Sequence, residues 1–252
     1  MRCSDRRMAD EAIILAGGCG TRLQGVVSDV PKPLAPVQGR PFLVWLLDLL
    51  ARQGMRRVVL ATGYKAEMVH AAIGELWQGM RIDYAVESSP LGTGGAIAQA
   101  LQRIEGEDAF VLNGDTYLEL DYARFAAAMR AQHAALGMVL AQVPDVSRYG
   151  AVHIANERVT GFSEKGGSGA GWINAGVYWL PHSLPLRAVT HAFSFEDTVL
   201  RAAAAQGTLS AYTASAAFID IGVPEDFQRA QAWHFASQAS PAGSFHFVQS
   251  TL

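Results

Sequence analysis

Short apolar runs alternate with segments of helical periodicity over the first 145 residues of the chain. The apolar runs have the length of buried β-strands, and the segments between them repeat apolar residues every three or four positions. We predict strands at 12–16, 58–62, 82–86, 109–112 and 138–143, and helices near 41–53, 66–73, 93–103 and 122–132. This alternation predicts an α/β fold with a doubly wound, mostly parallel sheet.

The pattern changes after about residue 145. Shorter strand-like runs follow at 149–154, 158–163 and 171–180, separated by glycine and charged turns. Such a β-rich insertion usually forms a lid or a substrate wall on an α/β core. A last helix is predicted after Pro224, at 225–235. We therefore predict a flexible N-terminus (1–10), a single domain (11–236) with parts at 11–145 and 146–222, and a C-terminal tail (237–252).

Composition excludes several classes of protein. The chain has 252 residues, 50% of them hydrophobic, which is enough for one sizeable core. A net charge of −3 and the lack of a basic run argue against a nucleic-acid partner. Two cysteines, Cys3 and Cys19, suit a reducing cytoplasm better than a disulfide framework or a zinc site. No apolar run approaches the ~18 residues of a membrane span, and the polar start lacks a signal-peptide core.

The first predicted strand leads into a glycine-rich segment with two cations. Gly17, Gly18 and Gly20 lack a Cβ, so their amides can approach an anion closely. Arg22 offers a planar fork of donors, whereas Lys32, between two prolines, offers a compact charge. These features predict a polyphosphate site; taken alone, the segment would be a glycine turn beside two solvated cations.

Two better-known phosphate-binding loops do not fit this segment. A P-loop requires four residues between its first glycine and a Gly-Lys-Ser/Thr, and that run does not occur. A dinucleotide fingerprint starting at Gly18 would need a glycine where Leu23 stands, and an acid after the strand at 58–62, where Gly63 stands.

Ligands of a parallel sheet bind at the carboxyl ends of its strands. There the chain has Glu87 after its third predicted strand and Asp115 after its fourth, and Asp220 ends the run 216–219. If the two aspartates are neighbours, they would form a Mg²⁺ site, because Mg²⁺ prefers one or two carboxylates together with phosphate oxygens and water. For either aspartate alone, a turn or a helix cap is the alternative.

These motifs together resemble the sugar-1-phosphate nucleotidyltransferases, or nucleoside-diphosphate-sugar pyrophosphorylases. The resemblance runs from about residue 11 to 232 and rests on the segments 15–23, 31–33, 91–96, 113–115, 149–150, 162–165, 174–176 and 220–222. Within the family, 26–37 and 41–43 resemble the D-glycero-α-D-manno-heptose 1-phosphate guanylyltransferases. The resemblance implies a Rossmann-like, GT-A-like fold, with nucleotide bound by 11–145 and sugar by 146–222.

The resemblance also implies a Mg²⁺-dependent reaction of an NTP, GTP for the subfamily, with a sugar 1-phosphate, giving an NDP-sugar and pyrophosphate. The implied catalytic residues are Arg22, Lys32 and Asp115, and the implied metal ligands are Asp115 and Asp220. Implied nucleotide-binding residues are Leu15, Ala16, Gly17, Gly18, Gly20, Thr21, Glu87, Gly92 and Thr93. Implied sugar-phosphate-binding residues are Tyr149, Gly150, Glu164, Lys165 and Asn174.

Some alternatives stay open. One is a uridylyl- or thymidylyltransferase acting on a hexose or amino-sugar 1-phosphate. Another is a catalytically silent subunit that binds nucleotide or sugar phosphate, although the presence of Arg22, Lys32, Asp115 and Asp220 together favours an enzyme. Gly166 departs from the Glu-Lys-Pro of many relatives. The aromatic segment 245–248 could pack on a second copy, so a homo-oligomer also stays open.

Overall fold

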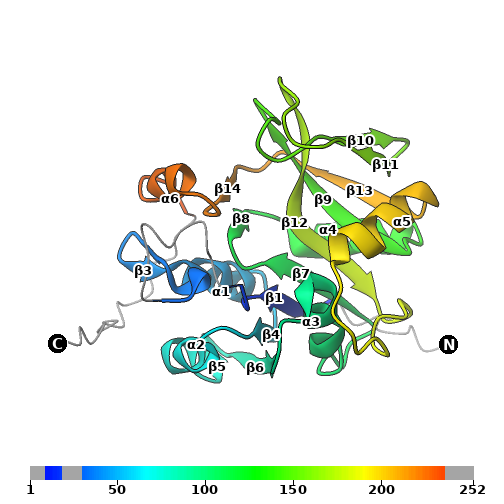
Figure 1. The fold of residues 1–252 in the computed structure, drawn as a ribbon. Helices are drawn as coiled ribbons and strands as arrows, with labels where there is room; N and C mark the ends of the chain where they lie inside the picture. Colours follow the sequence, from blue (N-terminus) through cyan, green and yellow to red (C-terminus); the bar gives the residue numbers. More distant parts are fainter. Residues whose placement is uncertain (1–8, 19–29, 236–252) are drawn as a thin grey trace.

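The computed structural model of the chain describes residues 9–18 and 30–235. In this part of the chain ten strands form one sheet, in the order β10-β11-β13-β9-β12-β7-β1-β4-β6-β5 (Figure 1). Seven of these strands run in one direction, and β5, β11 and β12 run the opposite way. Their bounds are β1 Glu11–Leu15, β4 Arg57–Thr62, β5 Leu76–Trp77, β6 Met80–Val86, β7 Asp108–Asn113, β9 Leu136–Val143, β10 Val152–Ala155, β11 Arg158–Phe162, β12 Gly171–Pro181 and β13 Leu209–Ala214. The predicted α/β fold with a mostly parallel sheet is confirmed.

Four helices agree with the predictions from periodicity. The described residues contain α1 Phe42–Arg52, α2 Ala66–Ile73, α3 Gly92–Leu101, α4 Tyr122–Ala131, α5 Arg201–Ala205 and α6 Pro224–Ala230. Helices α1 to α4 are the four predicted between residues 41 and 132. Helix α4 begins after Asp121, whose side chain accepts a hydrogen bond of 2.9 Å from the amide of Arg124 and so caps the helix.

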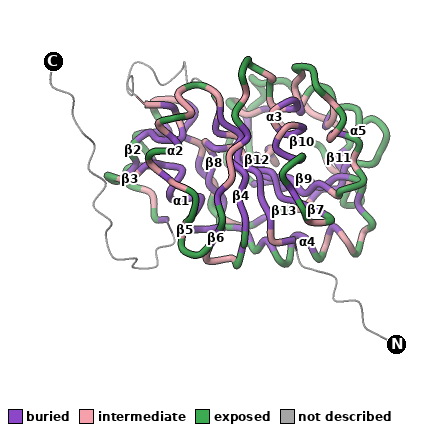
Figure 2. Tube along the Cα trace, turned by 90° about the horizontal axis from the view of Figure 1, so that it is seen from below, coloured by how far each residue is buried: buried purple, intermediate pink, exposed green. Residues whose placement is uncertain are grey.

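Helices cover both faces of the sheet. Successive strand residues point to opposite sides, and both sets are apolar in the central strands, so each face needs a cover. On one face Ile14 and Leu60 belong to a core shared with α1, α2 and α4. On the other, Ile13 and Val59 belong to a second core shared with α3 and α5. This is the doubly wound arrangement that the sequence predicts, and Figure 2 shows the buried residues concentrated along the central strands.

The predicted last helix, 225–235, is too long. Helix α6 ends at Ala230, and the chain then turns so that the Phe235 ring stacks on Trp45, with centroids 4.5 Å apart. The side chain of Gln38 supports this turn by donating a hydrogen bond of 2.6 Å to the carbonyl oxygen of Trp233. We infer that burying the Phe235 ring against α1 stabilises the fold more than extending α6 to residue 235 would.

Short elements were not predicted from the sequence. They are the 3₁₀ helix η2 (Lys32–Leu34), β2 (Pro36–Val37), β3 (Arg40–Pro41), β5, β8 (Thr116–Leu118), the π-helix η3 (Glu196–Leu200) and α5. The longer strand β13 was not predicted either. The β-rich part at 146–222 supplies β10 to β13, which join the same large sheet, and β14 (Phe218–Asp220), which pairs with β8. Among the described residues, no helix combines the length and apolar character needed to cross a bilayer.

Candidate active site

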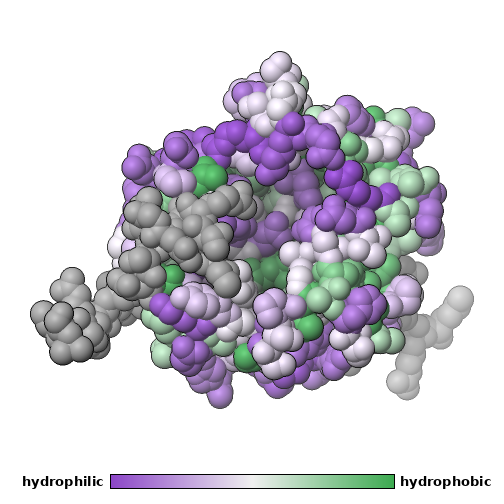
Figure 3. All heavy atoms as spheres, viewed as in Figure 1, coloured by the Kyte–Doolittle hydropathy of each residue, from purple (hydrophilic) through white to green (hydrophobic). Residues whose placement is uncertain are grey.

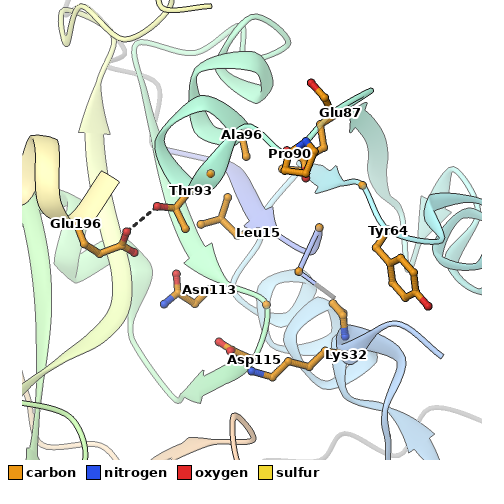
Figure 4. Close-up of a pocket in the computed structure, with 18 of the residues that line it drawn as sticks. Leu15, Lys32, Tyr64, Glu87, Pro90, Thr93, Ala96, Asn113, Asp115 and Glu196 are labelled. Atoms are coloured by element: carbon orange, nitrogen blue, oxygen red, sulfur yellow. Dashed lines mark hydrogen bonds and ion pairs between the residues drawn. The ribbon is translucent and has the colours of Figure 1, made fainter. Parts of the chain in front are cut away.

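A cavity of about 640 Å³ opens where β1, β4, β6 and β7 end. In Figure 3 the same face of the molecule is hollowed at its centre, with hydrophilic residues gathered along the upper rim. Figure 4 shows Lys32 and Asp115 together on one side of the cavity and Glu87 on another. The predicted site residues that line it are Leu15, Gly17, Gly18, Lys32, Glu87, Gly92, Thr93 and Asp115.

Two described residues predicted for the nucleotide and metal site, Ala16 and Asp220, do not line this cavity. Ala16 is buried, and its amide donates a hydrogen bond of 2.8 Å to the carbonyl oxygen of Ala61, which extends the pairing of β1 with β4. Gly20, Thr21 and Arg22 lie outside the described residues, so their roles stay predictions.

Two glycines make room for the Glu87 carboxylate. A Cβ on Gly63 would lie 2.5 Å from Oε1 of Glu87, and one on Gly17 would lie 3.0 Å from the same atom. The other carboxylate oxygen, Oε2, accepts a hydrogen bond of 2.9 Å from the amide of Leu91. The carboxylate is therefore held in a fixed orientation at the cavity wall.

The start of α3 packs against the segment 191–196. Gly92 has φ +66°, and a Cβ there would lie 2.5 Å from the carbonyl oxygen of Phe193. The hydroxyl of Thr93 donates a hydrogen bond of 2.6 Å to Oε2 of Glu196 and accepts one of 2.9 Å from the amide of Phe195. Close packing within the protein is thus one physical reason for glycine at 92.

Strands β8 and β14 bring the two predicted metal ligands together. They form an antiparallel pair in which Thr116 lies opposite Asp220, and the amide of Ile221 donates a hydrogen bond of 2.9 Å to the carbonyl oxygen of Asp115. Burial, and then the negative charge of Asp115, raise the pKa of the Asp220 carboxyl to about 6, although Lys32 acts in the opposite direction. The ammonium group of Lys32 forms an ion pair with the Asp115 carboxylate.

The two carboxylates fit a hard divalent cation. Their mutual repulsion is partly offset by Lys32, and a divalent cation would offset it further. No group of three or more His, Cys, Asp and Glu suited to a metal occurs within 9–18 and 30–235. Asp115 and Asp220 would therefore hold Mg²⁺ together with substrate phosphates and water, a ligand set that Mg²⁺ prefers.

A second cavity, of about 180 Å³, contains all five predicted sugar-phosphate residues. Its lining includes Tyr149, Gly150, Glu164, Lys165 and Asn174, together with Glu196, Asp197 and Arg201. Glu196 also lines the first cavity, so one carboxylate is shared by both. The structure thereby brings together residues that are spread over the second half of the sequence.

Asn174 is oriented by its own strand. Its side-chain Nδ2 donates a hydrogen bond of 2.8 Å to the Tyr178 hydroxyl, and its Oδ1 accepts one of 2.9 Å from the amide of Gly176. The register between β12 and β9 shifts at this point, which produces a local bulge. Glu164, another residue of this lining, pairs with Arg201 at 3.3 Å.

Sequence reasoning missed Tyr64, Glu196 and Arg201. Tyr64 lines the first cavity just after β4, so the strand-end rule applied to this strand would have indicated it. Glu196 begins the unpredicted π-helix η3, a kind of element often found at functional sites, and Arg201 begins α5. No motif of the sequence marks these two residues.

Comparison with known proteins identifies the family of the chain. The sequence matches the family described as Nucleotidyl transferase over residues 11–235. It is 39% identical to the D-glycero-alpha-D-manno-heptose 1-phosphate guanylyltransferase of Aneurinibacillus thermoaerophilus, over 88% of this chain and 96% of that protein. It is 35% identical to the mannose-1-phosphate guanylyltransferase of Mycobacterium tuberculosis, over 88% of this chain and 64% of that protein.

Solved structures extend the comparison. HddC from Yersinia pseudotuberculosis, complexed with GMP-PN, has a TM-score of 0.79 and 39% identity, covering 88% of this chain and 98% of that chain. A putative glucose-1-phosphate thymidylyltransferase from Bacillus anthracis, at 21% identity and a TM-score of 0.73, shares the fold. The fold and the ligand-sized cavity at its strand ends thus define an α/β protein with a binding site at the strand ends. The chain belongs to the nucleotidyltransferase family, as its sequence predicts.

Proposed function

We propose that this protein transfers a guanylyl group from GTP to D-glycero-α-D-manno-heptose 1-phosphate, with Mg²⁺, and releases pyrophosphate. The observation that carries the proposal is the pair of cavities that share Glu196, with the Asp115 carboxylate at the wall of the larger one. The larger cavity has the volume for a nucleotide, and the smaller gathers the predicted sugar-phosphate residues. Two relatives that match most of this chain are named as guanylyltransferases of this heptose phosphate.

Glu87 supports guanine as the base. Guanine presents two neighbouring donors, N1–H and the N2 amino group, and an ionised carboxylate has the acceptor capacity to meet both. Uracil and thymine present one N–H between two carbonyl groups. The oxygens of these carbonyl groups would be repelled by a carboxylate. The bond from the Leu91 amide to Oε2 leaves the carboxylate with unused acceptor sites.

Charge neutralisation and positioning are the main tasks that this reaction sets the protein. The phosphate oxygen of the sugar phosphate is already an anion at neutral pH, so it can attack the α-phosphorus in line without a general base. Lys32 lines the larger cavity, which supports a role for it in stabilising negative charge on the nucleotide phosphates, and we propose the same role for Arg22. Mg²⁺ held by Asp115 and Asp220 would add to this stabilisation.

On the sugar side, Asn174 would form hydrogen bonds with hydroxyl groups, the Glu164 carboxylate would accept them from hydroxyl groups, and Lys165 would contact the phosphate. Tyr149 and Gly150 would shape the pocket. The low cysteine content supports a reducing compartment, the cytoplasm, as the place of the reaction.

A substrate panel tests the proposal. Pyrophosphate release is measured with GTP, UTP, dTTP, CTP and ATP, each against the 1-phosphates of the heptose, mannose, glucose and N-acetylglucosamine. We expect the highest kcat/KM for GTP with the heptose 1-phosphate. Preference for UTP or dTTP would reject the guanylyl assignment, and preference for another sugar would reject the heptose assignment.

A further inference from the structure

Asp226 is a buried acid that neither cavity uses. It lies in the first turn of α6, is only 1% exposed, and is absent from the lining of both cavities. Two arginines pair with it: Arg148 from the loop before β10, and Arg229 one helical turn further along α6, at 3.2 Å. The Tyr149 hydroxyl also lies 3.4 Å from its Oδ2. One buried carboxylate therefore connects α6 to the loop that carries Arg148 and Tyr149.

This loop, residues 145–151, is joined to the wall of the smaller cavity, and we name it the sugar-side loop. The amide of Gly166 donates a hydrogen bond of 2.8 Å to the carbonyl oxygen of Ser147, and the amide of Ser163 donates one of 2.8 Å to that of Ala151. A Cβ on Gly150 would lie 2.6 Å from the carbonyl oxygen of Ser163. The sugar-side loop and the segment 163–166 are thus closely packed, and together they carry four of the predicted sugar-phosphate residues.

The other end of the connection lies next to the predicted metal ligand. Helix α6 follows β14, which ends at Asp220. The ring of Tyr149 packs edge-on against Phe218 of β14, with centroids 5.8 Å apart. The contacts of Asp226 therefore hold the sugar-side loop beside the strand that places Asp220.

We propose that Asp226 is a positioning residue for the sugar 1-phosphate, acting through Arg148 and Tyr149. It fixes the sugar-side loop, and with it the wall of the smaller cavity, relative to Asp220. The inference rests on the proposed function, because it assumes that the smaller cavity binds the sugar phosphate. Removing Asp226 itself would leave two arginines without their buried partner and could unfold the protein, so the test changes the arginines instead.

The two arginines make a matched pair of variants. Both contact Asp226 and both are partly exposed, but only Arg148 belongs to the sugar-side loop. We expect Arg148→Gln to raise the KM for the sugar 1-phosphate by about threefold to thirtyfold while the KM for the nucleotide changes little. Arg229→Gln should leave both KM values close to those of the wild type, and Arg148→Lys should recover part of the loss. Equal effects of Arg148→Gln and Arg229→Gln, or an unchanged sugar KM in Arg148→Gln, would overturn the inference.

Hydrogen exchange gives a second readout that does not depend on activity. We expect Arg148→Gln, but not Arg229→Gln, to speed the exchange of amides in 145–151 and 163–166 of the free protein. Unchanged exchange in Arg148→Gln would also overturn the inference. If the wild type turns over no substrate of the panel, the proposed function fails, and the exchange measurement still decides whether Asp226 fixes this loop.

Discussion

The amide of Ile221 donates a hydrogen bond of 2.9 Å to the carbonyl oxygen of Asp115, joining two segments that are far apart in the sequence. The bond continues the pairing of β14 with β8 and brings Asp220 next to Asp115. Asp115 lines the larger cavity, and Asp220 lies beside Asp115 without being part of the lining. Burial, and then the negative charge of the nearby Asp115, raise the pKa of Asp220.

The raised pKa of Asp220 predicts a specific dependence of stability on pH. Its pKa rises from 3.8 to about 6, so the folded protein binds this proton more readily than the unfolded chain does. Without divalent cations, the contribution of Asp220 to the free energy of unfolding should therefore fall as the pH rises through this interval. Between pH 5 and pH 8 this fall should lower the free energy of unfolding of the wild type by an amount on the order of 2 kcal/mol, measured by urea unfolding. The Asp220→Asn variant should not show this decrease.

Magnesium should reverse this effect in the wild type at pH 8, because a bound cation favours the charged carboxylates. The Asn variant should gain little stability from Mg²⁺. Equal stabilisation of both proteins by Mg²⁺ would contradict the assignment of Asp220 as a ligand.

Glu87→Gln should weaken the preference for GTP. The amide keeps one acceptor but presents a donor toward a guanine donor, whereas it can pair with the N–H and a carbonyl of uracil. We expect the ratio of kcat/KM for GTP to that for UTP to fall by about tenfold or more. Glu107→Gln is the control, because Glu107 is exposed and lies just before β7, at the end of that strand away from the cavity. An unchanged ratio in Glu87→Gln would remove Glu87 from base recognition.

Gly92 and Gly207 allow the cost of a contact to be separated from the cost of backbone strain. Their φ angles are +66° and +68°, but a Cβ would meet Phe193 only at Gly92, since nothing lies within 4 Å at Gly207. Gly207→Ala should cost about 1–2 kcal/mol of unfolding free energy from strain alone. Gly92→Ala should cost about 1–3 kcal/mol more, because the segment at Phe193 must move. Equal costs in thermal unfolding would show that this packing contributes nothing.

Sequence reasoning worked where one local signal dominates. The five longer strands and the four helices of the first 145 residues were predicted because a buried strand and an amphipathic helix each impose a period on the sequence. The end of α6 was not predicted, because it depends on the stacking of Phe235 on Trp45, which lies in a distant part of the sequence. Short elements such as β8 were also missed, because three residues carry too little periodicity.

The same distinction applies to the site. The sequence indicates the positions of three residues that line the larger cavity. Glu87 and Asp115 follow predicted strands, and Lys32 stands between two prolines. Glu196 could not be found in this way. Its place between the two cavities depends on the hydrogen bond from Thr93 and on the packing of 191–196 against α3, which no local pattern encodes.

The shared position of Glu196 predicts a broader effect than that of its neighbour Asp197. Glu196 lines both cavities, whereas Asp197 lines the smaller one. Glu196→Gln should therefore raise the KM for both substrates, and Asp197→Asn only that for the sugar phosphate. A double-mutant cycle with Thr93→Val should give a coupling on the order of 1 kcal/mol in kcat/KM, because Thr93 donates to this carboxylate. Additive effects would show that the Thr93 bond does not orient Glu196.

Pyrophosphate release from GTP and D-glycero-α-D-manno-heptose 1-phosphate, compared between the wild type and Asp115→Asn, tests the central claim most directly. We predict Mg²⁺-dependent release by the wild type, with the GDP-sugar formed in equal amount, and loss of that release in a variant that circular dichroism shows to be folded. Undiminished release by Asp115→Asn, or release by the wild type that does not depend on Mg²⁺, would contradict the account.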